Sequence, residues 1–167
     1  MDITTQFINE CCYYNELNLP RIKKCLDLLS ENEIWVTPNN NTNSVANLIL
    51  HLNGNITQYI LSGLGGVKDN RQREKEFTTR SGYSKIELYT LIETTILEAG
   101  KVIRSLPEDI LLKTRFIQGF NITGTGAIIH VTEHLSYHTG QIAFITKSIK
   151  DKDLGFYSNS DLNTRNS

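Results

Sequence analysis

The sequence lacks any apolar run long enough to cross a membrane. A helix that spans a bilayer needs about 20 consecutive apolar residues, and this chain of 167 residues contains no such run. The first residues, Met1 to Gln6, also lack the basic segment and apolar stretch of a secretory signal. The sequence therefore predicts a cytoplasmic protein that does not insert into a membrane.

The sequence also lacks an excess of charge of one sign. It has 17 Lys and Arg residues against 18 Asp and Glu residues, which gives a net charge of −1, and the basic residues are scattered. A protein that binds nucleic acid normally gathers its basic side chains on one face. We therefore expect no nucleic-acid partner.

Cysteine is scarce, and its pattern excludes two common roles. The chain has Cys11, Cys12 and Cys25 and no Cys-x-x-Cys pair. An odd count with two adjacent residues is a poor disulfide framework, and the missing pair removes the usual thiolate zinc site. Because adjacent residues on a helix point about 100° apart, we expect one of Cys11 and Cys12 to be buried and the other to lie near the surface.

The sequence does contain four long stretches with apolar residues at helical spacing. Ser44 and Ser84 are good N-caps for the second and third stretches. Pro20 interrupts the first stretch, which is therefore either one kinked helix or a turn followed by a helix from Pro20. The four predicted helices span about 3–29, 44–64, 84–106 and 124–150.

Four long helices around one core predict an all-α four-helix bundle. The connection at 66–83 is polar and is longer than an antiparallel turn needs. It is long enough to recross a helix of about 30 Å. The second and third helices are therefore expected to run parallel, in an up-down-down-up order.

Two other segments complete the predicted organisation. Residues 108–123 are ambiguous, with short extended pieces at 114–117 and 120–123 around a glycine. The polar end of the chain predicts a tail. We expect one helical bundle over 1–157 and a polar C-terminal tail over 158–167.

Histidines form the most informative pattern. The chain has four, His51, His130, His134 and His138, and the last three recur every four residues. Residues four apart lie one above the other on a helix, so two such imidazoles can reach one metal ion. His130 and His138 are separated by about 12 Å along the axis, so one ion cannot bind all three.

The apolar stripe of the last helix selects a pair. Counted at about 100° per residue, His138 lies about 25° from the centre of the stripe, His134 about 65° and His130 about 105°. The inward pair is His134 and His138, while His130 lies on the flank as a neighbour or a hydrogen-bonding group. A third ligand must come from elsewhere, and His51 lies on the flank of its own stripe. Spacing alone leaves open that these histidines are core residues bonded to one another.

Two segments carry a resemblance to a known family. His51-Leu-Asn-Gly-Asn55 and His134-Leu-Ser-Tyr-His-Thr-Gly-Gln-Ile142 resemble the DinB/YfiT-like superfamily of metal-dependent bundles, in an uncharacterised branch. The resemblance covers the chain from its first helix to about Tyr157. It implies an up-down-down-up bundle, often a homodimer, and a divalent metal ion, commonly zinc or nickel. By motif, the resemblance implies that the ligands are His51, His134 and His138.

The resemblance also implies a class of activity. Characterised members of the superfamily are thiol-dependent S-transferases that use bacillithiol or mycothiol, and related isomerases or hydrolases. We therefore expect a metal-dependent enzyme that activates a water or a thiol for a small-molecule substrate, with a low-molecular-weight thiol as a candidate partner. The alternative is a metal-binding or stress-related structural bundle without turnover. No residue is identified as the catalytic base.

Three polar residues near the predicted site are candidates for binding a cofactor or substrate. Asn55 lies one turn after His51, and Tyr137 and Gln141 flank the histidine face of the last helix. Each could orient a metal ligand or contact a substrate. Each could equally be an ordinary polar residue beside a groove.

Two further expectations concern packing and charge. Gly140 is expected to let a neighbouring helix come close. Arg71 and Arg73 lie in the polar connection, where a solvated loop is the first interpretation and contact with an anionic substrate is the second.

Overall fold

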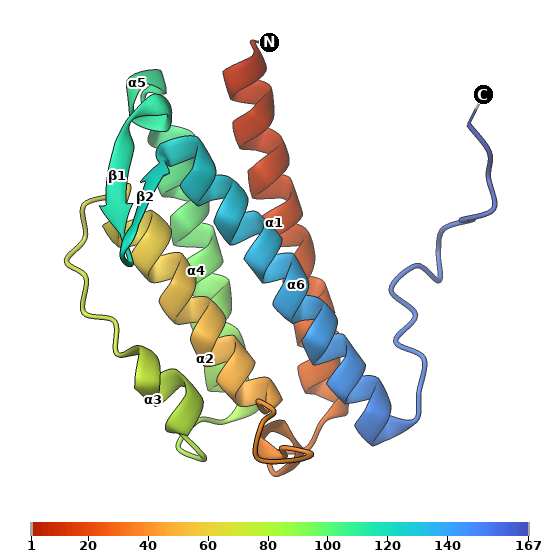
Figure 1. Ribbon diagram of the computed structural model, residues 1–167. Coiled ribbons are helices and arrows are strands. Elements are labelled where there is room, and N and C mark those ends of the chain that lie inside the picture. Colours follow the sequence, from red (N-terminus) through yellow and green to blue (C-terminus); the bar gives the residue numbers. More distant parts are fainter. Residues whose placement is uncertain (1, 167) are drawn as a thin grey trace.

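The computed structural model describes residues 2–166, and long helices dominate it (Figure 1). Its only sheet among these residues is a two-stranded antiparallel hairpin. The fold is therefore all-α, which confirms the predicted class. The long helices are α1 (Ile3–Leu28), α2 (Val45–Ile56), α4 (Lys85–Ser105) and α6 (Gly124–Lys150), and the shorter elements are η1 (Glu33–Trp35), η2 (Thr57–Ser62), α3 (Arg73–Thr78), α5 (Glu108–Leu112), β1 (Thr114–Ile117) and β2 (Phe120–Thr123).

Each long helix packs against two of the others. α1 lies against α4 and α6, and α2 lies against the same two helices. In Figure 1, α1 and α6 descend while α2 and α4 ascend. The connection from α2 to α4 passes down the side of the bundle through α3, so α2 and α4 run in the same direction.

Helix starts and the core follow the sequence pattern. The Ser44 side chain accepts a hydrogen bond from the backbone of Asn47, and Ser84 forms a capping box with Glu87. The apolar stripe of α2 is almost fully buried, and burying each such side chain contributes about 1.5–3 kcal/mol. Its buried members are Val45, Leu48, Ile49, Leu52 and Ile56.

Several predicted bounds differ from those observed. α1 is one continuous helix through Pro20, which faces solvent while Leu19 and Ile22 beside it are buried. The second helix stays α-helical to Ile56 and then widens into the π-helical turn η2. The segments predicted as a polar loop and as ambiguous chain contain α3 and α5, whereas both extended pieces form the predicted strands.

The expectation for the adjacent cysteines was wrong. Cys11 and Cys12 are both buried, and neither they nor Cys25 form a disulfide. Cys12 lies against the backbone of Gly100 on α4, while Cys11 lies beside Thr132 on α6. Because α1 packs against two helices, its buried arc is wide enough for two residues about 100° apart. Burial raises the pKa of all three thiols.

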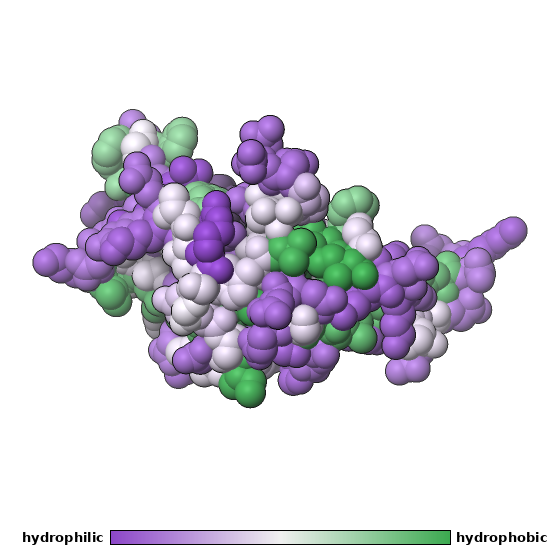
Figure 2. All heavy atoms as spheres, turned by 90° about the horizontal axis from the view of Figure 1, so that it is seen from below, coloured by the Kyte–Doolittle hydropathy of each residue, from purple (hydrophilic) through white to green (hydrophobic). Residues whose placement is uncertain are grey.

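The face of the molecule at the α3 end of the bundle is mostly hydrophilic (Figure 2). Figure 2 looks along the bundle from the end that carries α3, and hydrophobic side chains form limited patches among polar ones. Within residues 2–166, no helix combines the length and the apolar character that crossing a bilayer requires.

Candidate metal centre

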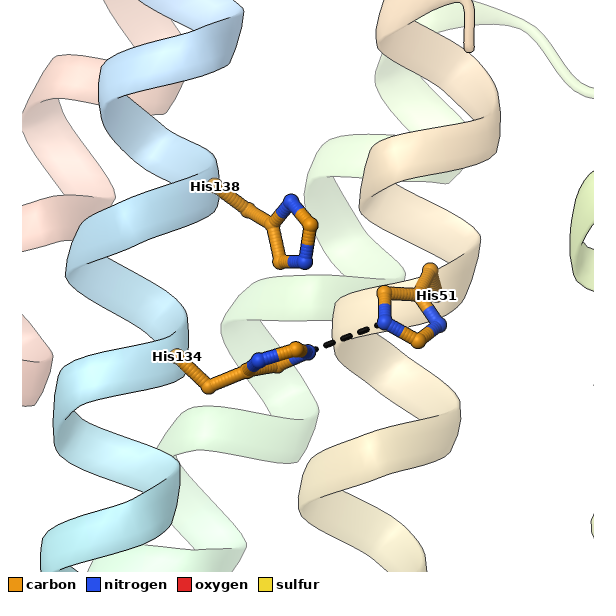
Figure 3. Close-up of side chains that lie close together, drawn as sticks. All are labelled: His51, His134 and His138. Atoms are coloured by element: carbon orange, nitrogen blue, oxygen red, sulfur yellow. Dashed lines mark hydrogen bonds between the residues drawn. The ribbon is translucent and has the colours of Figure 1, made fainter. Parts of the chain in front are cut away.

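Three histidines from two neighbouring helices point toward one space inside the bundle (Figure 3). His51 comes from α2, and His134 and His138 come from successive turns of α6. One ring nitrogen of each lies within 4.8 Å of the other two, and Nε2 of His51 is 2.9 Å from Nε2 of His134. These are the three residues that sequence analysis selected, and together they could hold a metal ion.

His51 is more buried than its position on the flank of α2 had indicated. Its side chain is flanked by α6 on one side and by α3 on the other, where the Phe77 ring lies 4.8 Å away. Only 6% of the residue is exposed. The flank of α2 that carries His51 is therefore buried, because α3 covers it. This short helix was not predicted.

Glu76 orients the His51 ring. Its Oε2 lies 2.9 Å from Nδ1 of His51, in the interior of the protein. An ionised carboxylate only accepts hydrogen bonds, so this contact requires the proton of the imidazole to be on Nδ1. Nε2 of His51 then keeps its lone pair and faces the two histidines of α6.

Arg71 pairs with Glu76 through both carboxylate oxygens. Arg71 Nε donates to Oε1 at 2.7 Å and Nη2 donates to Oε2 at 2.9 Å. Nη1 donates to Gln58, while the backbone N–H of Arg71 donates to Asp69. Burial opposes ionisation of Glu76, but the hydrogen bonds from Arg71 and His51 outweigh it and lower the pKa of Glu76.

The interpretation of Arg71 as part of a solvated loop was wrong. Its side chain is only 3% exposed, because α3 folds the connection back against α2. Arg73 does remain exposed, and its guanidinium lies 4.9 Å from the centre of the Phe77 ring.

Gln141 orients a second buried histidine, His138. Its Oε1 lies 2.7 Å from Nδ1 of His138. With the proton on Nδ1, Nε2 of His138 also keeps its lone pair toward the cluster. Tyr137 is exposed, and its ring meets His138 edge-on at 5.0 Å.

His130 lies beside the cluster and is not part of it. Its Nε2 is 3.3 Å from Nδ2 of Asn55, and its ring lies 4.3 Å from that of Tyr59. Asn55 is buried, and its Oδ1 has no hydrogen-bond partner among the described residues. Asn55 therefore contacts the flanking histidine, whereas Gln141 contacts one of the three convergent ones.

The cluster favours neutral imidazoles. Burial, together with the nearby His138, His51 and His130 rings, lowers the pKa of His134 to about 3. Burial also lowers the pKa of His138, although the bond to Gln141 opposes this shift. Neutral imidazole is the form that binds metal ions, so the His134 and His138 rings have the correct protonation at neutral pH.

The geometry fits a divalent ion that prefers nitrogen ligands. Zinc binds imidazole at about 2.0–2.1 Å, which places tetrahedral ligand atoms about 3.4 Å apart. The observed separations, from 2.9 Å to at most 4.8 Å, span this value. Three protein ligands leave a coordination position open, as in catalytic zinc sites.

Two surface grooves flank this region. One, of about 470 Å³, lies between α6 and the loop before α2 and includes Tyr137, Gly140 and Gln141. The other, of about 490 Å³, is lined by Gly54 of α2 and by Arg71 and Glu76. A Cβ built on Gly140 meets no atom within 4 Å. Gly140 therefore opens onto a groove, and the expected close approach of a helix was wrong.

Glu76 was not predictable from helical periodicity, because its segment has no apolar periodicity. One signal was present, a glycine in the interior of helix α2. A Cβ on Gly54 would overlap Oε1 of Glu76 and lie 2.8 Å from its Cδ and 3.0 Å from Nε of Arg71. Gly54 thus marks the point where the ion pair approaches the backbone of α2.

Comparisons with known proteins agree with this architecture. The family described as "Protein of unknown function (DUF1572)" matches residues 2–160. No curated protein matches the sequence. The structure of a DinB-like protein, YjoA from Bacillus subtilis, is similar with a TM-score of 0.66 at 16% identity, covering 89% of this chain and 96% of that one. A conserved protein from Enterococcus faecalis is similar with a TM-score of 0.72 at 13% identity, covering 91% and 99%. The fold is therefore that of DinB-like proteins.

Proposed function

This chain belongs to the DUF1572 family, whose members are described as proteins of unknown function, and from that premise we propose that it is a metal-dependent enzyme. In this proposal His51, His134 and His138 hold one divalent ion, zinc or nickel. Such an ion would supply a Lewis acid that makes a water or a thiol a nucleophile at neutral pH. The reaction class is thiol S-transfer or hydrolysis.

The orientation of the imidazoles carries the proposal. Glu76 and Gln141 accept from Nδ1 of two different histidines, which leaves both Nε2 lone pairs directed toward His134. Hydrogen bonds to the outer nitrogen are the usual support of histidine ligands to metals. Histidines that only filled a core would not need an acceptor at Nδ1 and an inward lone pair on Nε2 at two separate positions.

The groove beside Gln141 is the proposed place for a small-molecule substrate. Its volume of about 470 Å³ suits a small ligand, and none of the residues that line it carries a charge. We propose that Tyr137 and Gln141 contact an uncharged part of the substrate. The lining residues are Pro38, Asn41, Thr42, Asn43, Leu48, Tyr137, Gly140, Gln141, Phe144 and Ile145.

The second candidate is a metal-binding bundle without turnover. The observation that favours it is that none of the three histidines is among the residues that line this groove. Turnover would require Tyr137 or Gln141 to move aside or to transmit substrate contact to His138.

Metal content and activity separate these candidates. The protein loaded with zinc or nickel should contain about one ion per chain by elemental analysis, and His138→Ala should lose it. His130→Ala is the matched control, because it removes a histidine of α6 outside the cluster and should retain the ion. Unchanged metal content in His138→Ala would contradict the proposed site.

The reaction class is tested on the metal-loaded protein. We expect turnover of thiol-conjugation or amide-hydrolysis substrates that disappears in His138→Ala and persists in His130→Ala. Metal binding without turnover of either class would favour the second candidate.

A homodimer is also proposed. The hairpin exposes Phe116 and Phe120, and Leu112 of α5 is exposed as well, which gives apolar surface for a second copy. Light scattering on the full chain should give twice the monomer mass, and a monomer mass would contradict it.

A further inference from the structure

We propose that Glu76 is a positioning residue, which holds His51 with its Nε2 toward the metal centre, and that Arg71 and Gly54 place Glu76 there. The inference rests on the proposed metal site. It assigns a role to a segment, the connection between α2 and α4, that contributes no ligand of its own.

Both carboxylate oxygens of Glu76 are used. Oε2 accepts from Nδ1 of His51 and from Nη2 of Arg71, and Oε1 accepts from Nε of Arg71. The guanidinium therefore fixes the plane of the carboxylate in a two-point contact. The contact of Oε2 with Nδ1 of His51 then fixes both the tautomer and the direction of the ring.

The segment that carries Glu76 is itself anchored to α2. Nδ2 of Asn47 donates to the backbone oxygens of Glu76 and Thr79, both at 2.9 Å. Arg71 is held at the other end of the segment by Gln58 and Asp69. Glu76 therefore lies in a segment that hydrogen bonds hold in place on both sides of the Arg71–Glu76 ion pair.

Gly54 makes the approach of Glu76 sterically feasible. It lies one turn after His51 on α2, and a Cβ there would overlap Oε1 of Glu76. Any other residue would displace the carboxylate from the His51 ring. Because this position touches no ligand, it offers a way to move Glu76 without removing it.

Metal affinity tests the role of Glu76. Outer partners of metal-bound histidines typically contribute about 10–100-fold to affinity, so Glu76→Ala should raise the zinc Kd by about that factor. Affinity is measured by competition with a chromophoric chelator on variants whose circular dichroism shows a folded bundle. Glu76→Gln keeps an acceptor oxygen for Nδ1 of His51 and should recover part of the loss.

A pair of glycine variants provides the matched control. Gly54→Ala keeps Glu76 and all three histidines but displaces the carboxylate, and it should weaken zinc binding about tenfold or more. Gly140→Ala is also a change within a helix near the site, but its Cβ meets no atom, and its zinc Kd should stay within about twofold of the wild type.

Two spectroscopic readouts separate positioning from a purely structural role. Nitrogen NMR of histidine should show His51 with its proton on Nδ1 in the wild type and a mixture of tautomers in Glu76→Ala. The visible spectrum of the Co²⁺-loaded protein should change in Glu76→Ala and Gly54→Ala but not in Gly140→Ala. A role in stability alone would lower the melting temperature and leave both spectra unchanged.

The outcomes distinguish this inference from the proposed function. A wild-type protein that binds no zinc overturns both. A wild-type protein that binds zinc, with Glu76→Ala equal to it in Kd and in both spectra, overturns the positioning role and leaves the metal site in place. Equal zinc affinity in Gly54→Ala and Gly140→Ala overturns the part assigned to Gly54.

Discussion

At the scale of single residues, the most consequential contact is an ion pair in the interior. The side chains of Arg71 and Glu76 are 3% and 9% exposed, and the nearest oxygen and nitrogen are 2.7 Å apart. A buried pair adds little over a well-packed apolar pair, but the loss of one partner leaves an uncompensated charge. The pair therefore makes this region sensitive to single substitutions.

We expect Arg71→Met to lower the free energy of unfolding by about 3–5 kcal/mol, because Glu76 would be left buried without its cation. Urea denaturation at neutral pH measures this loss. Lys68→Met is the matched control, since Lys68 is an exposed cation of the same connection, and it should change stability by less than about 0.5 kcal/mol. Similar effects of the two substitutions would contradict the importance of the buried pair.

At the scale of the elements, α1 tolerates a residue that normally disrupts helices. Pro20 lies well inside this helix of 26 residues, away from both ends, and its side chain faces solvent. The residues around it that face the bundle are buried, among them Leu19, Ile22 and Cys25. Packing against α4 and α6 thus outweighs one lost backbone hydrogen bond, and tertiary contacts keep the helix continuous.

We expect Pro20→Ala to stabilise the protein by about 1–3 kcal/mol. The new N–H can bond to the backbone oxygen of Glu16, and alanine has a higher helix propensity than proline by about 3 kcal/mol. The urea concentration at the midpoint of denaturation should rise. The slope of the free energy of unfolding against urea concentration should stay the same. Exposed Lys23→Ala on the same helix serves as the control and should be nearly neutral. A lower midpoint for Pro20→Ala would show that the proline shapes α1 in a way the bundle requires.

At the scale of the whole molecule, the histidine cluster links folding to pH. The pKa of His134 is lowered from 6.5 to about 3 in the folded protein. Between these values the unfolded chain binds a proton that the folded chain does not, so the folded state loses stability as the pH falls. The groups that face His134 are the His51, His130 and His138 rings and the Arg71 cation, and all of them disfavour a further positive charge.

We therefore expect the metal-free protein to lose stability steadily as the pH falls from about 6.5 toward 3. Glu76 acts in the same direction at the acid end of this range, because its lowered pKa stabilises the fold only while it is ionised. Urea denaturation at a series of pH values measures the slope of the free energy of unfolding against pH. His134→Asn removes one titrating ring and should reduce the slope above about pH 4.5, where His138 and His130, whose pKa values are also lowered, still contribute. An unchanged slope would contradict the assignment to His134.

Much of the fold and part of the site were predictable from the sequence, because they depend on local periodicity. The stripes of α2, α4 and α6, and the caps Ser44 and Ser84, are properties of neighbouring residues. The same helical count placed His138 and His134 inward and His130 on the flank, and the structure has this order. The third histidine, His51, was named by resemblance, since its own helix placed it at an edge.

Only the tertiary structure determined what covers the edge of α2 on which His51 lies. Whether Arg71 is solvated, whether both adjacent cysteines are buried and whether Gly140 meets a helix all depend on which elements pack together. The contact of Glu76 with His51 joins residues 25 apart through a short helix without an apolar stripe. The sequence by itself therefore determined the helices and the inward histidines, whereas the folding back of a polar segment decided how one of those histidines is held.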